Sequence, residues 1–211
     1  MARRDVKLLV VLLLPLILGG AALITCFPPF RPAFNFATVL DGKAYRTGWI
    51  SSKELERLIK TYQIRSLVIL DSPSKTRALV ETASRRSVYT VTIQLRDKKH
   101  PRKEQLQELV DAIEHAPTPV LFHDSWGAYK SMLASAFYLI VREGATPSRA
   151  RQAFSLWNGY IPWGPQVEAT RPLERYAEWR RTTNVPDGPE AVRRWLGEGY
   201  WPQQISVDNS P

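Results

Sequence analysis

The chain contains very little cysteine. Of its 211 residues only Cys26 is a cysteine, and it lies at the end of an apolar stretch. A disulfide within the chain is therefore excluded, and the fold must be stabilised by a hydrophobic core. Dense runs of like charge and internal repeats are also lacking. The net charge of +9 is spread over short pairs such as Arg85-Arg86, which is typical of a solvated surface.

The sequence contains no recognised DNA- or RNA-binding motif, so nucleic acid is not an expected partner. Its positive charge also suits lipid headgroups or phosphorylated ligands. The composition alone does not decide between these two classes of ligand.

Residues 8–27 form an uncharged stretch of 20 residues, unlike the rest of the chain. At about 1.5 Å per residue, a helix of this length crosses a hydrocarbon core of roughly 30 Å. Arg3, Arg4 and Lys7 precede the stretch, which predicts a cytoplasmic N-terminus and an extracytoplasmic domain, periplasmic in a bacterium. We expect residues 1–27 to be a single-pass signal anchor or transmembrane helix. A cleaved signal peptide is the alternative.

Cys26 offers a second route to the membrane. The sequence Leu23-Ile24-Thr25-Cys26 loosely resembles a bacterial lipoprotein box, whose cysteine is lipidated after cleavage. Thr25 departs from that pattern, since a small residue usually precedes the cysteine. A lipoprotein anchored at Cys26 is thus the alternative to a cysteine that simply lies in an apolar anchor.

The part of the chain after the anchor reads as one α/β domain. A proline-rich spacer at 28–35 precedes a domain at 36–183, and a tail at 184–211 follows it with a short helix near 190–196. Turn signals, capping patterns and apolar periodicity alternate between strands and helices. The expected elements are a hairpin at 36–47, strands at 66–70, 88–95 and 119–122, and helices at 51–62, 102–115, 131–142 and 147–157. This alternation predicts a central, mostly parallel sheet flanked by helices.

A glycine-containing loop between the last predicted strand and an apolar helix is the strongest candidate site. Loop amides and a helix N-terminus together form a cradle for an anion. The loop resembles the phosphate loop of the cysteine-dependent tyrosine and dual-specificity phosphatases, His-Cys-x-x-Gly-x-x-Arg-Ser/Thr. The predicted phosphate-loop residues are His123, Asp124, Ser125, Trp126, Gly127, Ala128, Tyr129, Lys130 and Ser131.

The resemblance extends over residues 34–160. The segment at 41–48, DGKAYRTG, looks like the opening of bacterial and plant dual-specificity-like phosphatases, and 55–70 looks like their next helix and strand. Asp97 falls where the family keeps its general acid, and 134–144 fits the helix after the loop. The resemblance implies a dual-specificity-phosphatase-like fold, with a structural role for His123 and a hydroxyl role for Ser131.

Two replacements set this chain apart from that family. Asp124 stands where the nucleophilic cysteine belongs, and Lys130 stands where the arginine belongs. A carboxylate at the loop can accept hydrogen bonds from the amides meant for phosphate, and a lysine lacks the planar fork of arginine. We therefore expect a membrane-anchored pseudophosphatase that lacks cysteine-dependent catalysis and has a phosphate-binding, anion-binding or scaffold role.

Two other hypotheses remain. In the first, the protein is an active phosphatase that hydrolyses phosphate monoesters, with Asp124 as nucleophile or metal ligand, Lys130 as phosphate clamp and Asp97 as acid. In the second, it is a structural envelope protein in which Asp124 and Lys130 form an internal ion pair. Asp71 follows a buried strand, but Pro73 stands where a haloacid-dehalogenase-like enzyme needs its second aspartate.

The sequence predicts no cofactor and no dedicated metal site, because no second carboxylate lies within two residues of Asp124. Four aromatic side chains near the loop and after it could wall a pocket or fill the core, and their size favours the core. They are Trp126, Tyr129, Tyr160 and Trp163.

Overall fold

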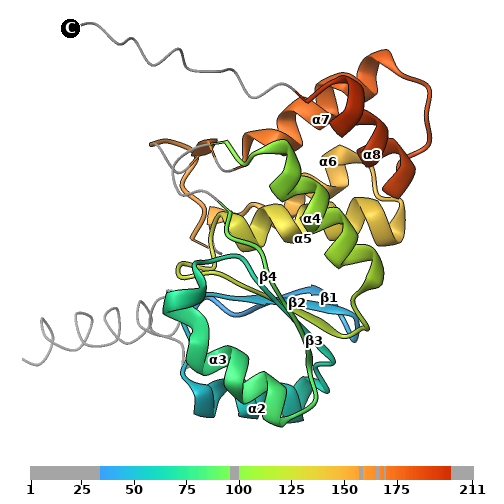
Figure 1. Cartoon of the computed structure of the whole chain (residues 1–211). Coiled ribbons are helices and arrows are strands. Elements are labelled where there is room, and N and C mark those ends of the chain that lie inside the picture. Colours follow the sequence, from blue (N-terminus) through green and yellow to red (C-terminus); the bar gives the residue numbers. More distant parts are fainter. Residues whose placement is uncertain (1–33, 96–99, 157–158, 165–166, 169, 201–211) are drawn as a thin grey trace, which may run out of the picture.

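The computed structural model describes residues 34–95, 100–156, 159–164, 167–168 and 170–200 (Figure 1). The predicted anchor at 1–27, with Cys26, and the acid candidate Asp97 lie outside these residues. Within the described ranges, no helix has both the length and the apolar character needed to cross a bilayer.

A five-stranded sheet lies at the centre of the domain (Figure 1). Its strands, in the order β1-β2-β5-β3-β4, are β1 (Ala37–Leu40), β2 (Ala44–Thr47), β5 (Val120–His123), β3 (Ser66–Ile69) and β4 (Tyr89–Thr92). The β1–β2 pair is antiparallel and the other pairs are parallel, which confirms the predicted mostly parallel sheet. Thr47 and Ile69 both pair with His123, so β2, β5 and β3 end side by side at one edge.

Helices cover both faces of the sheet (Figure 1). One face carries α2 (Ser52–Tyr62) and α3 (Pro73–Arg85), and the other carries α4 (Lys103–His115) and α5 (Lys130–Glu143). Alternate strand residues point to opposite faces, so Leu121 packs toward α2 and Phe122 toward α5. Beyond α4 and α5 lies a further group: α6 (Pro147–Ala150), the 3₁₀ turn η2 (Arg151–Ala153), α7 (Arg171–Thr182) and α8 (Pro189–Glu198).

Local sequence signals place most of these boundaries. The Ser51 hydroxyl accepts a hydrogen bond from the Glu54 amide at 3.1 Å, as the predicted cap requires. Gly144 ends α5 with a φ of 61°, a left-handed conformation that glycine adopts at little cost. By contrast, β4 ends at Thr92 and is shorter than the predicted strand.

The C-terminal helix α8 completes the core on the α5 side. Trp195 is fully buried, and its ring lies 6.0 Å from that of Phe137 on α5 and 5.4 Å from that of Tyr176 on α7. The start of the predicted tail therefore packs as part of the domain.

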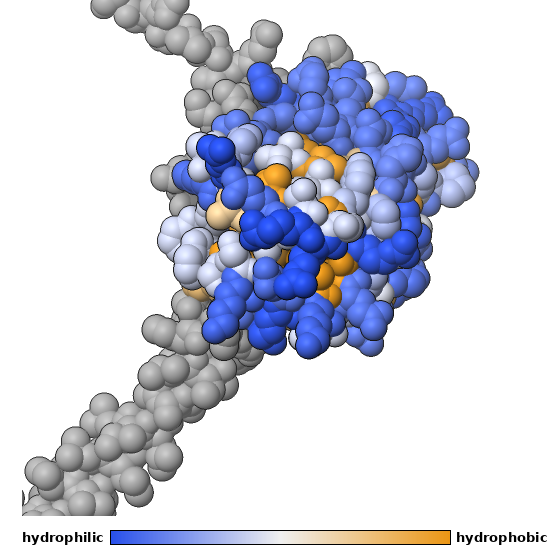
Figure 2. All heavy atoms as spheres, turned by 60° about the horizontal axis from the view of Figure 1, so that its bottom comes forward, coloured by the Kyte–Doolittle hydropathy of each residue, from blue (hydrophilic) through white to orange (hydrophobic). Residues whose placement is uncertain are grey.

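The outer surface over α2 and α3 differs from this apolar interior. Seen from the side that brings α2 and α3 forward, the surface is mostly hydrophilic, with small apolar areas between the polar side chains (Figure 2). This pattern agrees with the scattered positive charge of the sequence.

Replacing Trp195 tests whether α8 belongs to the cooperative core. We expect Trp195→Ala to lower the free energy of unfolding by about 3–5 kcal/mol, because a large cavity replaces a fully buried ring. Trp163→Ala is the matched control, since that side chain is 70% exposed, and it should change stability by less than about 0.5 kcal/mol. Urea unfolding of both variants measures the difference, and equally small effects would show that α8 is not part of the core.

Candidate functional site

The candidate loop joins the central strand β5 to α5. His123 is the last residue of β5 and Lys130 the first of α5, so 124–129 connect a buried strand to a helix N-terminus. The unpaired amides and the positive end of the helix dipole at such a junction attract negative charge. The structure therefore places the predicted phosphate-loop residues in the expected strand–loop–helix arrangement.

Two glycines set the shape of the loop. Gly127 has a φ of 62°, and a Cβ atom there would collide with the backbone of Gly48 at the end of β2. A Cβ on Gly48 would in turn lie 2.9 Å from the carbonyl carbon of Trp126. The loop and the β2 end thus approach so closely that neither position accepts a side chain.

Side chains from the N-terminal hairpin hold the outer side of the loop. The Arg46 guanidinium and the Asn35 side-chain amide both donate to the Gly127 carbonyl, with 2.9 Å between Asn35 Nδ2 and the oxygen. Asn35 also donates to the Trp126 carbonyl at 3.1 Å. Burial lowers the pKa of Arg46 to about 10, although the nearby Asp124 carboxyl acts against this shift.

His123 connects the ends of two neighbouring strands. Its Nδ1 lies 2.9 Å from the Gly48 carbonyl oxygen, which ties β5 to the β2 end. Burial lowers the pKa of His123 below its usual value, against opposing effects of Asp71 and the Gly48 carbonyl. The lowered pKa favours the neutral imidazole, and the contact with Gly48 fixes the ring at the start of the loop.

The Asp71 carboxylate reaches the loop from the end of β3. Its Oδ2 accepts hydrogen bonds from both the amide and the hydroxyl of Ser125, each at 2.5 Å. Its Oδ1 lies 2.7 Å from Lys130 Nζ, and both side chains of this ion pair are buried. Burial acts to raise the pKa of Asp71, but the hydrogen bonds from Lys130 and Ser125 outweigh it and the pKa is lowered.

Asp124 lies inside the loop with little solvent contact. The residue is 3% exposed, and neither its Oδ1 nor the Ser131 Oγ has a hydrogen-bond partner in the described residues. Burial raises the pKa of Asp124 to about 6, and the nearby Asp71 charge adds to the effect. The Ser131 hydroxyl, Lys130 and the Gly127 amide act in the opposite direction without cancelling it.

The predicted ion pair between Asp124 and Lys130 is wrong. Among the described residues, the carboxylate in contact with the Lys130 ammonium is that of Asp71. Asp71 comes from a different strand and already holds the loop amide of Ser125, so it can satisfy the buried lysine at close range. The Lys130 charge lowers the pKa of Asp124, against the larger effect of burial.

The four aromatic residues near the loop do not all fill the core as expected. Trp126 and Trp163 are 68% and 70% exposed. Tyr129 and Tyr160 are half-buried, and their ring centroids lie 5.8 Å apart. Two of the four indole and phenol side chains are therefore mostly in solvent, and the two tyrosines pack against each other.

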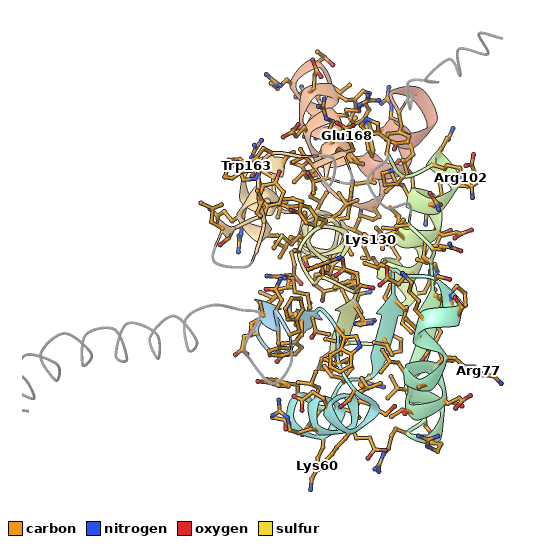
Figure 3. The ribbon with its side chains drawn as sticks, turned by 90° about the vertical axis from the view of Figure 1, so that its left-hand side faces the viewer. Lys60, Arg77, Arg102, Lys130, Trp163 and Glu168 are labelled. Atoms are coloured by element: carbon orange, nitrogen blue, oxygen red, sulfur yellow. The ribbon has the colours of Figure 1, made fainter. Side chains whose placement is uncertain are left out.

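A polar cavity of about 420 Å³ lies beside the loop, where Asp71 and Lys130 meet residues of α3 and α4. Lys75 and Arg102 also line it, together with Glu104 and Glu108. Lys130, Arg102 and Trp163 are marked in Figure 3, where Lys130 lies between the other two. In the described part of the chain, no three His, Cys, Asp or Glu side chains are grouped to hold a metal ion.

The structure adds three site residues that the sequence reasoning did not assign to the loop: Asn35, Arg46 and Asp71. Arg46 belongs to the segment that resembles the phosphatase opening, which was the available signal. Asp71 follows a buried strand, at the sheet edge where ligands bind in folds of this class, so the sequence signalled its place but not its partners. Asn35 carried no signal. The acid role predicted for Asp97 is untested, because that residue lies outside the described ranges.

No family model matches the sequence, and no curated protein matches it. Solved structures do match. The core catalytic domain of the PP-IP phosphatase SIW14 from S. cerevisiae, in complex with citrate, aligns with a TM-score of 0.53 and 13% identity, over 81% of this chain and 99% of that one. A cysteine-to-serine variant of TpbA from P. aeruginosa, in complex with phosphotyrosine, aligns with a TM-score of 0.54 and 15% identity, over 80% and 94%.

PTPMT1 in complex with PI(5)P is a third similar structure, with a TM-score of 0.54 and 18% identity over 69% of this chain and 98% of that one. At these identities the likeness concerns the fold alone. The sheet and its flanking helices therefore have a tyrosine/dual-specificity-phosphatase-like fold.

Proposed function

We propose that this protein is a membrane-anchored pseudophosphatase, a phosphatase-fold domain without cysteine-dependent catalysis that serves as a binding or scaffold module. One observation carries the proposal: the carboxylate of Asp71 takes the Ser125 amide and the Lys130 ammonium, two groups that a bound phosphate would need. The loop is thus satisfied by the protein's own negative charge.

The residue at the nucleophile position supports the same conclusion. Asp124 is buried, and its pKa of about 6 means that ionising it inside the loop costs free energy. Above that pH Asp124 adds a second negative charge beside Asp71, which weakens the attraction that Lys130 and Arg46 offer an incoming phosphate. A phosphoryl acceptor of this kind needs strong charge compensation, and the nearest ammonium already pairs with Asp71.

The membrane attachment rests on the sequence. The uncharged stretch at 8–27 and the basic residues before it favour a single-pass anchor, with the N-terminus cytoplasmic and the domain extracytoplasmic. A lipid on Cys26 is the alternative anchor. Either attachment makes the membrane the first partner of the domain.

The ligand class follows from the loop and from the similar structures. SIW14 is described as a PP-IP phosphatase, and TpbA and PTPMT1 were solved with phosphotyrosine and PI(5)P. For this chain we propose weak binding of a phosphorylated or other anionic group, limited by the internal carboxylates.

An active phosphatase is the second candidate function. Asp71 lies close enough to Asp124 to raise its pKa, so two carboxylates share one polar region. A pair of this kind attracts a divalent cation, and a bound cation could turn Asp124 into a nucleophile or a metal ligand. Lys130 and Asp97 would then act as clamp and acid.

A phosphatase assay separates the two functions. We expect the chain and its Asp124→Ala variant to release phosphate from para-nitrophenyl phosphate at the same low rate, with or without Mg²⁺ or Mn²⁺. The reason is that the loop has neither a thiolate nor a free clamp. Metal-dependent release that disappears in Asp124→Ala would instead establish the active phosphatase.

Restoring the two replaced residues tests how much of the site is preserved. We expect Asp124→Cys with Lys130→Arg to gain hydrolysis that iodoacetamide abolishes, because a thiolate at a helix N-terminus is a strong nucleophile. Asp124→Ser with Lys130→Arg is the matched control and should stay inactive. A folded but inert cysteine variant would show that the remaining loop no longer supports the chemistry.

The pKa of Asp124 gives a pH-dependent prediction. Its folded-state value of about 6 exceeds the reference value of 3.8, so the folded state binds this proton more tightly than the unfolded state. This proton therefore stabilises the folded state fully below pH 3.8, and the stabilisation is lost as the pH rises through 6. Asp124→Asn removes this loss.

We therefore expect the stability of Asp124→Asn, relative to the unchanged chain, to increase by about 2 kcal/mol between pH 4 and pH 8. Urea unfolding of both proteins at the two pH values measures the change. The contribution of His123 cancels in the difference between their free energies of unfolding, because both proteins contain it. A difference that does not vary with pH would mean that Asp124 ionises as freely as a solvated carboxyl group.

A further inference from the structure

The domain exposes large apolar side chains around the loop at the point where the described chain begins. Trp49, Trp126 and Trp163 are 66%, 68% and 70% exposed, and Ile161 is also exposed. We call these four side chains, three indoles and the neighbouring Ile161, the aromatic rim. Exposed apolar groups gathered near one site mark an interaction surface more often than scattered ones do.

Contacts in the structure bring the segments of the rim together. Gly48, next to Trp49, approaches the backbone of Trp126, and Phe34 packs edge-on to the Trp126 ring at 6.4 Å. The segment with Ile161 and Trp163 is tied to the same loop through the Tyr129–Tyr160 ring contact. The rim is therefore built from the β2 end, the loop and the segment after η2.

The rim lies beside the chain's connection to the predicted anchor. Phe34 is the first described residue, and its carbonyl accepts a hydrogen bond from the Gly48 amide at 2.7 Å. Six residues separate Phe27, the end of the uncharged stretch, from Phe34, and even a fully extended chain spans at most about 25 Å over these seven Cα–Cα steps. An anchored domain must therefore keep this part of its surface near the bilayer.

We propose that the aromatic rim docks into the headgroup region of the bilayer that holds the anchor, so that the loop faces the membrane. This proposal rests on the membrane attachment proposed above. Indole rings favour this depth, because an apolar ring and a polar N–H meet there at the border between hydrocarbon and water. The short tether keeps the rim at a high local concentration next to the lipid, so weak contacts are sufficient.

The end of the domain formed by α2 and α3 is more polar. Lys60 and Arg77 on α2 and α3 point outward at the end opposite Trp163 (Figure 3). The face over these helices is mostly hydrophilic (Figure 2). A second copy of the chain is the competing occupant of the rim, and the experiment below distinguishes it.

The test uses the full chain with Cys26→Ser, placed in vesicles of phosphatidylcholine and phosphatidylglycerol. A bimane label on Pro162→Cys reports the rim, because Pro162 lies exposed between Ile161 and Trp163. A label on Lys60→Cys reports the distant end. With a nitroxide on the lipid headgroup, we expect several-fold stronger quenching of the Pro162 label than of the Lys60 label.

Flotation of the vesicles distinguishes the proposed membrane attachment from the proposed docking of the rim. If the protein does not float with the lipid, the anchor fails and the docking fails with it. If it floats and the two labels are quenched equally, the anchor stands and the docking is wrong. A different result would assign the rim to a second copy of the chain. In that case the Pro162 label is shielded from water but not quenched by the lipid nitroxide, and the shielding increases with protein density.

Variants of the rim test whether the indoles themselves make the contact. We expect Trp49→Ser with Trp163→Ser to lose most of the quenching at Pro162. Tyr89→Ser is the matched control, because Tyr89 is an exposed aromatic residue on β4, outside the rim, and it should leave the quenching unchanged. Full quenching in the double variant would show that the tether alone orients the domain, which overturns the rim.

Discussion

The ion pair between Asp71 and Lys130 is the contact on which the site depends. It joins the end of β3 to the first residue of α5, and the second oxygen of the same carboxylate holds the Ser125 amide of the loop. Each buried charge needs the other, because an unpaired lysine or aspartate in this position would cost several kcal/mol. One carboxylate thus positions the helix start, the loop and the ammonium together.

This contact also determines the electrostatics of Asp124. A neighbouring negative charge adds to burial in raising the pKa of Asp124, while the ammonium that could offset it is drawn to Asp71. The backbone of the loop keeps the shape that Gly127, Gly48 and Arg46 impose. The result is a strand–loop–helix junction in which two carboxylates, Asp71 and Asp124, lie beside two cations, Lys130 and Arg46, and this balance is the basis of the proposed binding or scaffold role.

The sequence predicted what depends on local patterns. The cap at Ser51, the end of α5 at Gly144 and the strand–loop–helix at 120–143 all follow from signals within a few residues. The role of Asp71 could not be predicted, because its partner Lys130 lies 59 positions away and only the β3–β5 pairing brings them together. Nor did the size of Trp126 and Trp163 reveal their exposure, since indoles serve both cores and interfaces.

The beginning of the domain and the loop form one connected unit. Asn35 donates to two loop carbonyls, and the Phe34 carbonyl accepts from Gly48, whose own backbone touches Gly127. A tether that leaves the domain at Phe34 is therefore joined to the loop through hydrogen bonds and direct backbone contact. An orientation imposed by the proposed membrane attachment would therefore reach the loop first.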